Sequence, residues 1–229
     1  MNNIKQFTIC SLLFFAMATS AQVNRTGLYG DISYTFGVHL FGGMNYYFGD
    51  IEKGGIFSKD AKNQINYFVE GGFSYAFFDY MMMRADLIHG RLSGNRANYT
   101  FKSLFLEPDF ILEFHPWKIF SEKYDFYGIV GAGLTFSRVN FYDRTYDFHR
   151  NLQVYMPVIP LGVGYRYNFS NGFQIGAEFA YRFALMDSEN NNLDGFPYTY
   201  NGKIQRGKES KFFDGYYILG ITFGYQWSK

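Results

Sequence analysis

Charged side chains recur at alternate positions inside otherwise apolar segments of this 229-residue chain. Glu178 and Arg182 share one side of the run from Phe173 to Leu185, in which every odd position is apolar. Acids and bases held together away from water can act as a catalytic carboxylate pair, as a proton path or gate, or as ion pairs that only fix a structure. The elements that position these charges decide between the three.

The run from Phe173 to Leu185 has the two-residue period of a β-strand with unlike faces. The segment from Tyr216 to Trp227 repeats this pattern, with large apolar residues at its odd positions. Eight segments alternate in this way: residues 35–48, 65–78, 81–92, 102–114, 124–137, 153–167, 172–185 and 214–227. The sequence therefore predicts an all-β fold of eight antiparallel strands.

The connections between these segments alternate in length. Short links cover residues 79–80, 115–123 and 168–171, whereas longer and more polar links cover residues 49–64, 93–101, 138–152 and 186–213. Short periplasmic turns and long extracellular loops are typical of an up-and-down barrel in the outer membrane. We therefore expect an OmpA-like transmembrane β-barrel with both termini on the periplasmic side.

A soluble barrel of the lipocalin type is the alternative fold. Its interior would be apolar, but the charges of this chain share a face with the small residues. After the N-terminal segment there is no run of about 18 uncharged apolar residues, which excludes a helical membrane span. The net charge of +1, without a basic stripe, argues against a nucleic-acid partner.

Residues 1–21 have the features of a secretory signal peptide. Lys5 supplies a positive charge, the run from Ile9 to Met17 is apolar, and small residues up to Ala21 precede the expected cleavage site. The only cysteine, Cys10, lies within this segment. The expected mature chain, residues 22–229, is the outer-membrane barrel domain and contains no disulfide.

Strand parity places a set of charged residues inside the barrel, which we call the lumen network. Its members are Glu70, Arg84, Asp86, Glu107, Asp109, Glu113, Arg166, Glu178 and Arg182. The interior of an eight-stranded barrel is just wide enough for side chains to fill, so these charges should pack against one another. We favour a salt-bridged plug that fixes the shape of the barrel, and a gate, a proton path or a catalytic pair is the alternative.

The histidines give little support for an enzyme. His39, His89, His115 and His149 lie far apart, and none is followed two positions later by serine, the arrangement found in lipid A deacylase barrels. No paired-histidine or His/Cys metal spacing occurs either. We therefore expect no catalytic residues, no cofactor and no metal, with a lipid-modifying enzyme that uses His89 or His149 as the least favoured alternative.

Five runs of the sequence together resemble one family. They are GMNYYFGD from Gly43 to Asp50, GRLSG from Gly90 to Gly94, YGIVGAG from Tyr127 to Gly133, PVIPLGVGYR from Pro157 to Arg166 and IGAEFAYR from Ile175 to Arg182. In this order they resemble the landmarks of the PorG-like outer-membrane β-barrel proteins of Bacteroidota. The resemblance implies an eight-stranded barrel that serves type IX protein secretion and meets a periplasmic lipoprotein.

The link at residues 115–123 is the longest on the periplasmic side and carries His115, Trp117 and Phe120. These residues are the candidate contacts for a periplasmic partner. The sequence thus predicts a non-enzymatic barrel that contacts outer-membrane lipid and acts as a membrane anchor or interaction component, for which the resemblance implies a role in secretion. A narrow channel or small-molecule transporter, suggested by the polar interior, is the alternative function.

Overall fold

The computed structural model describes residues 35–49, 51, 64–78, 80–96, 98–116, 123–186, 192–196, 198–205 and 214–228. The expected signal peptide, residues 1–21, lies outside these ranges. All described residues belong to the unit Tyr34–Lys229. Among them, no helix is long and apolar enough to cross a membrane.

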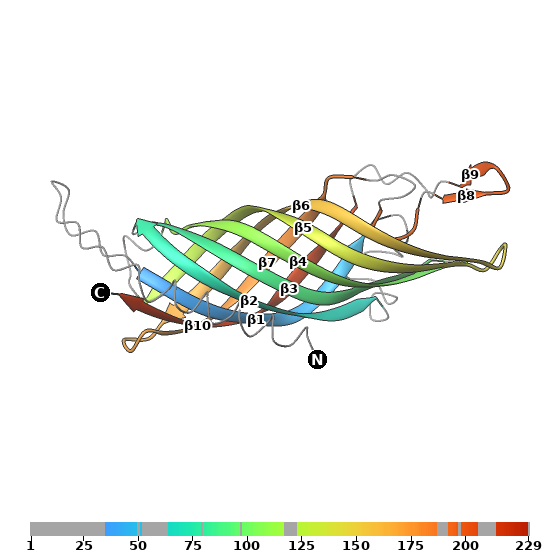
Figure 1. Cartoon of the computed structure of the whole chain (residues 1–229). Coiled ribbons are helices and arrows are strands. Elements are labelled where there is room, and N and C mark those ends of the chain that lie inside the picture. The colour runs from blue at the N-terminus through green and yellow to red at the C-terminus, as the bar shows by residue number, and fades with distance from the viewer. Residues whose placement is uncertain are drawn as a thin grey trace, which may run out of the picture. The chain divides into compact units, whose positions relative to one another are not determined.

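Eight strands close into one antiparallel barrel (Figure 1). They are β1 (Thr35–Phe48), β2 (Ile65–Phe78), β3 (Met81–Arg96), β4 (Tyr99–Phe114), β5 (Tyr124–Asp143), β6 (Phe148–Asn168), β7 (Phe173–Ala184) and β10 (Gly215–Ser228). Neighbours in the chain pair with one another, and β10 pairs with β1 to close the ring. Two short strands, β8 (Tyr198–Tyr200) and β9 (Lys203–Gln205), form a hairpin in the longest connection. The predicted eight-stranded antiparallel barrel is confirmed.

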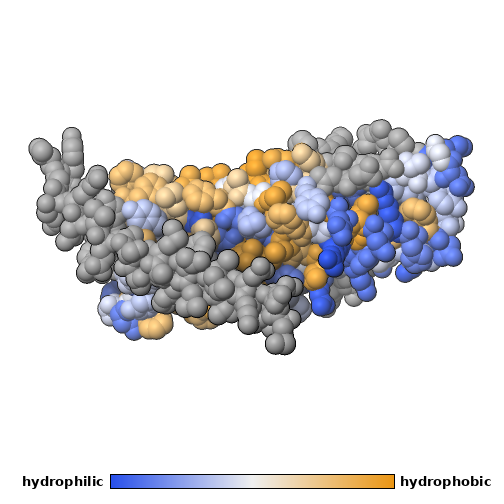
Figure 2. Space-filling view, viewed as in Figure 1, coloured by the Kyte–Doolittle hydropathy of each residue, from blue (hydrophilic) through white to orange (hydrophobic). Residues whose placement is uncertain are grey.

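The strands have an outward apolar face and an inward charged face, as their two-residue period predicts. In β7 the odd positions from Phe173 to Phe183 face outward, and Glu178 and Arg182 are buried inside. Large apolar side chains are exposed on all eight barrel strands. Figure 2 shows hydrophobic residues spread over the barrel wall, and hydrophilic residues gathered where Figure 1 places the β5–β6 hairpin. A soluble barrel would have the reverse arrangement.

The two ends of the barrel differ in the segments that lie there. At the terminal end β1 begins and β10 ends, and at the loop end lie the β3–β4 and β5–β6 hairpins. Two connections at the loop end are shorter than predicted, because residues 93–101 and 138–152, expected to be loops, mostly continue the strands. The β3–β4 turn lies between the strand ends at Arg96 and Tyr99, and the β5–β6 turn lies at residues 144–147. The backbone ladder continues into a zone where the alternation is reversed, with Val139 and Phe141 buried inside and Arg138 and Asn140 exposed. A pattern that expects an apolar outer face therefore ends before the strands do.

The longest connection folds back over the barrel at the loop end. Residues 192–196 and β8 form what we call the mouth cap, and Leu193, Asp194 and Phe196 of this cap are buried. Asp194 Oδ2 accepts a hydrogen bond of 2.9 Å from Tyr47 Oη of β1. The Phe196 ring lies 5.2 Å from the ring of Phe141 in β5, measured between centroids. Residues 192–196 therefore pack into the mouth of the barrel, whereas the tip of the β8–β9 hairpin is exposed.

Candidate functional site

All nine members of the lumen network lie inside the barrel, and each is less than a tenth exposed. They occupy the half of the interior toward the terminal end. Aromatic and aliphatic side chains fill the half toward the loop end, among them Phe41, Phe68, Ile88, Phe101 and Phe105. The interior thus has a charged layer and a mainly apolar layer, and the mouth cap covers the latter. Buried Asp143, Asp194 and Asp214 lie at the loop end as well.

Arg182 organises the middle of the charged layer. Its Nε lies 2.7 Å from Glu107 Oε1, and its Nη2 lies 3.0 Å from Asp109 Oδ2. The hydroxyls of Thr135 and Tyr216 donate to the second oxygen of Glu107. Arg182 thus lies between two carboxylates from β4, and hydroxyls from β5 and β10 complete the hydrogen bonding of one of them.

Arg84 organises the next layer toward the terminal end. Its Nε donates to Asp86 Oδ2 at 2.9 Å, and its Nη1 donates to Glu113 Oε1 at 2.7 Å and to Glu178 Oε2 at 2.8 Å. Tyr127 Oη donates a further hydrogen bond of 3.0 Å to Glu178 Oε2. One guanidinium therefore connects side chains from β3, β4 and β7 across the barrel.

Arg166 and His115 close the network at the terminal end. Arg166 Nη2 donates to Glu113 Oε1 at 3.0 Å, and its guanidinium lies 4.5 Å from the centre of the Tyr127 ring. His115 Nδ1 lies 2.9 Å from Asp125 Oδ1, and its Nε2 lies 3.0 Å from Glu113 Oε2. Burial lowers the pKa of His115, but the carboxylates of Asp125 and Glu113 more than offset this and raise it above the ordinary value.

His115 differs from its expected role as a partner contact. The side chain is 2% exposed and is held against Asp125 and Glu113, so a periplasmic protein cannot reach the imidazole. The reason is its position directly after β4, where the side chain still points into the barrel. Trp117 and Phe120, the other two candidate contacts, lie outside the described residues.

Several residues of the charged layer were missed from the sequence. His39 of β1 lies 3.1 Å from Asp86 Oδ1 and 3.4 Å from Glu70 Oε1, measured from its Nε2. Asp125, Tyr127 and Tyr216 also face inward and contact the network. Parity within β1 could have placed His39 inside, but both Leu40 and Phe41 are apolar, so hydropathy does not distinguish the two faces there.

The packing of the charged layer limits its chemistry. The cavity lined by His39, Ser74, Met82 and Arg84 has a volume of about 10 Å³, which holds about one water molecule. A substrate of organic size does not fit beside these charges. The described ion pairs are suited to holding the strands together, and a catalytic carboxylate pair would lack room for its substrate.

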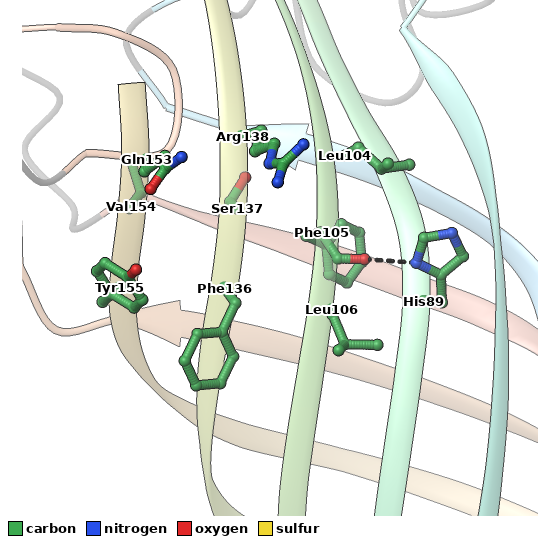
Figure 3. A pocket seen from close by; sticks show the side chains of 10 residues that line it. All are labelled: His89, Leu104, Phe105, Leu106, Phe136, Ser137, Arg138, Gln153, Val154 and Tyr155. Atoms are coloured by element: carbon green, nitrogen blue, oxygen red, sulfur yellow. Dashed lines mark hydrogen bonds between the residues drawn. The ribbon is translucent and has the colours of Figure 1, made fainter. Parts of the chain in front are cut away.

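A shallow depression of about 310 Å³ lies on the outer wall across β3 to β6 (Figure 3). His89 is one of its lining residues, and its Nδ1 lies 3.0 Å from the carbonyl oxygen of Phe105. Ser137 also lines the depression, but its hydroxyl is paired with that of Ser103. Figure 3 shows His89 and Ser137 on different strands with β4 between them. They form no nucleophile and base pair.

His149, expected in a loop, lies in strand β6 and is exposed. Its imidazole stacks on the ring of Tyr142 at 4.2 Å between centroids. The difference arises because β5 and β6 stay paired as far as Asp143 and Phe148, beyond the predicted strand ends. The stacked ring lies on the surface at the loop end, away from the lumen network.

No model of a known protein family matches the chain. A search of curated proteins likewise finds no relative. Solved structures do resemble it. Ail, the attachment invasion locus protein of Yersinia pestis, is 14% identical, with 83% of this chain and 98% of Ail covered and a TM-score of 0.45.

Two further structures are similar in the same way. The N-terminal β-barrel domain of Pseudomonas aeruginosa OprF is 14% identical over 84% of this chain and 97% of that domain, with a TM-score of 0.43. A major outer membrane protein of Thermus thermophilus is 9% identical over 85% of this chain and 99% of its own, with a TM-score of 0.49. At such identities the similarity is one of fold.

Proposed function

We propose that this protein is a non-enzymatic outer-membrane β-barrel that anchors an interaction partner in the membrane. The observation that carries the proposal is the arrangement of its two faces. Apolar side chains cover the outer wall, and the charged side chains are buried in a filled interior. Such a wall is stable in lipid, and such an interior leaves no space for a substrate.

Lipid is the first proposed partner. Exposed apolar residues include Val69 of β2, Phe110 of β4, Leu161 of β6 and Phe223 of β10. A tilted strand of about 9–11 residues spans the hydrocarbon core of a bilayer. β6 has 21 residues, so its part toward the loop end would project beyond the membrane, where the wall becomes hydrophilic.

Export through the signal peptide, residues 1–21, is part of the proposal. Fractionation of the native cells should recover the protein with the outer membrane, and the mass of the mature chain should correspond to a start at Gln22. Recovery of the protein in the soluble fraction would contradict the membrane location. A mature chain that keeps residues 1–21 would contradict the signal peptide alone.

The second proposed partner is a periplasmic lipoprotein of the type IX secretion machinery. Two observations support this role: the sequence runs that resemble the PorG-like family, and the turn at residues 115–123. Asp125 and Glu113 hold His115 at the base of this turn, whose sequence carries the aromatic residues Trp117 and Phe120.

Cross-linking of cell envelopes followed by capture of the tagged barrel tests this partner. We expect a secretion lipoprotein to be recovered with the wild type and lost with the double variant Trp117→Ala/Phe120→Ala. Phe169→Ala is the matched control, because Phe169 is an exposed aromatic residue of another short turn, residues 168–171. If the wild type captures no such lipoprotein, the secretion role is wrong and only the membrane anchor remains.

A narrow channel is the second candidate function, and the polar interior favours it. The hydrogen bonds that Arg84 and Arg182 make across the interior argue against a channel, since both side chains extend across the path that an ion would take. The mouth cap also closes the loop end. Conduction would therefore require both layers to rearrange.

A further inference from the structure

Three side chains that can bind a metal converge in the charged layer: His39, Glu70 and Asp86. His39 Nε2 and Asp86 Oδ1 have no hydrogen-bond partner among the described residues, and neither does Glu70 Oε2, which lies 3.8 Å from Arg182 Nη2. The side chains of Glu70 and Asp86 are fully buried, and that of His39 is 11% exposed. A buried polar atom without a partner costs free energy, so a group of three calls for an explanation.

The strand register brings these donors together. Gly72 of β2 pairs with His39 of β1 on one side and with Asp86 of β3 on the other. Glu70 lies two residues from Gly72 on the same face of β2. A Cβ at position 72 would lie 2.1 Å from Asp86 Oδ1 and 2.6 Å from His39 Cε1. The space between the imidazole and the carboxylate therefore exists because residue 72 has no side chain.

The distances between these side chains are compatible with a shared metal ion. His39 Nε2 lies 3.1 Å from Asp86 Oδ1 and 3.4 Å from Glu70 Oε1, and neither contact has hydrogen-bond geometry. Glu70 Oε1 also accepts a hydrogen bond of 3.4 Å from Arg84 Nη2. Ligand atoms about 2.0–2.1 Å from a tetrahedral zinc ion lie about 3.3–3.4 Å from one another. One imidazole nitrogen and two carboxylate oxygens are also a donor set that zinc accepts.

The surrounding charges favour a cation at this position. The lumen network and Asp125 together contain seven carboxylates and three guanidiniums, counting Glu70, Asp86, Glu107, Asp109, Glu113, Asp125, Glu178, Arg84, Arg166 and Arg182. Arg84 Nε bonds to Oδ2 of Asp86, which leaves Oδ1 for another partner. The cavity of about 10 Å³ beside His39 has room for about one water molecule.

We propose that His39, Glu70 and Asp86 bind a divalent transition-metal ion of the zinc class inside the barrel. The ion joins three neighbouring strands, β1, β2 and β3, and offsets part of the excess negative charge of the interior. Its role is structural, because the layers around it leave no space for a substrate. The competing occupant of the same position is a proton on His39.

Zinc binding by the tag-free barrel tests this proposal. The purified protein is refolded in detergent with a chelator, dialysed, and titrated with Zn²⁺ against a chromophoric competitor, and bound zinc is counted by elemental mass spectrometry. We expect one zinc ion per chain. His39→Gln and Asp86→Asn should each weaken binding roughly 10- to 100-fold or more, because each removes one of three protein ligands.

Two further variants separate a metal site from other effects. Gly72→Ala keeps every donor and fills the space between them, so it should also weaken zinc binding. His89→Gln removes an exposed histidine of the outer wall and should leave zinc binding unchanged. A wild type that binds no zinc, or a folded His39→Gln variant that binds as tightly as the wild type, would overturn the proposal and favour the proton.

Discussion

Arg182 is the residue whose loss should damage the interior most. It is fully buried and pairs with Glu107 and Asp109 at 2.7 and 3.0 Å. Arg182→Met keeps most of the side-chain volume but leaves two buried carboxylates without their cation. We expect the free energy of unfolding to fall by about 3–5 kcal/mol, measured by urea titration in detergent or lipid.

The control for this prediction is Arg91→Met, since Arg91 lies on the same barrel but is exposed. Its loss should change the free energy of unfolding by no more than about 0.5 kcal/mol. An Arg182→Met variant as stable as the control would mean that the buried ion pairs contribute little to the barrel.

The raised pKa of His115 predicts that the stability of the barrel depends on pH. Its pKa is raised in the folded protein by Asp125 and Glu113, against the opposite effect of burial. When a histidine has a higher pKa in the folded state than in the unfolded state, its protonation stabilises the folded protein. This stabilisation is fully present below the unfolded pKa of about 6.5 and is lost as the pH rises through the folded pKa. His115→Gln should therefore lower the urea midpoint at acidic pH and affect it less at alkaline pH.

Urea titrations of the wild type and of His115→Gln at several pH values measure this difference. A deficit that grows as the pH rises would contradict the assignment, because it would mean that the neutral imidazole is the stabilising form. His149→Gln serves as the control, as His149 is exposed and stacks on Tyr142.

Strand parity predicts which side of the wall a charge occupies, and the structure places all nine predicted residues inside. Parity cannot predict which charges pair, because Arg182 and Glu107 are 75 residues apart and meet only when the barrel closes. It also says nothing about neutral donors such as Thr135 and Tyr216, whose hydroxyls complete the hydrogen bonding of Glu107. The sequence therefore predicts the members of the lumen network but not their pairing or their neutral hydrogen-bond donors.

At the scale of strands, Gly162 shows how closely β6 and β7 approach. A Cβ at this position would lie 2.4 Å from the carbonyl oxygen of Phe179 and 2.8 Å from Ala180 Cα. Because both atoms belong to the backbone, they cannot move aside easily. We expect Gly162→Ala to lower the free energy of unfolding by about 1–3 kcal/mol in the same urea titration.

Gly128→Ala is the matched control for this strand prediction. Gly128 lies on the neighbouring strand, and the nearest atom to its added Cβ is 4.0 Å away. The stability of this variant should stay within about 0.5 kcal/mol of the wild type. Equal losses in the two variants would indicate a general need for glycine in these strands instead of a specific close approach.

The existence of the eight barrel strands could be predicted from the sequence, but the length of β3 to β6 at the loop end could not. Over most of the barrel the apolar residues face outward and the charged residues face inward. Toward the loop end this alternation is reversed, because Val139 and Phe141 of β5 are buried inside whereas Arg138 and Asn140 are exposed. A pattern that expects an apolar outer face therefore ends before the paired strands do.

At the scale of the whole molecule, the barrel is filled from the terminal end to the loop end. The lumen network occupies one half, apolar side chains such as Phe105 and Phe141 occupy the other, and the mouth cap covers the latter. The outer wall is apolar over most of this length and becomes hydrophilic toward the loop end. These features together favour a membrane anchor over a channel.

The conductance of the purified wild-type barrel in planar lipid bilayers tests this account most directly. Insertion is verified in the same preparation by resistance of the barrel to added protease. We predict that inserted protein produces no stable current steps, because ion pairs and aromatic side chains occupy the whole interior. Reproducible, ion-selective current steps from the inserted wild type would contradict the account and establish a channel.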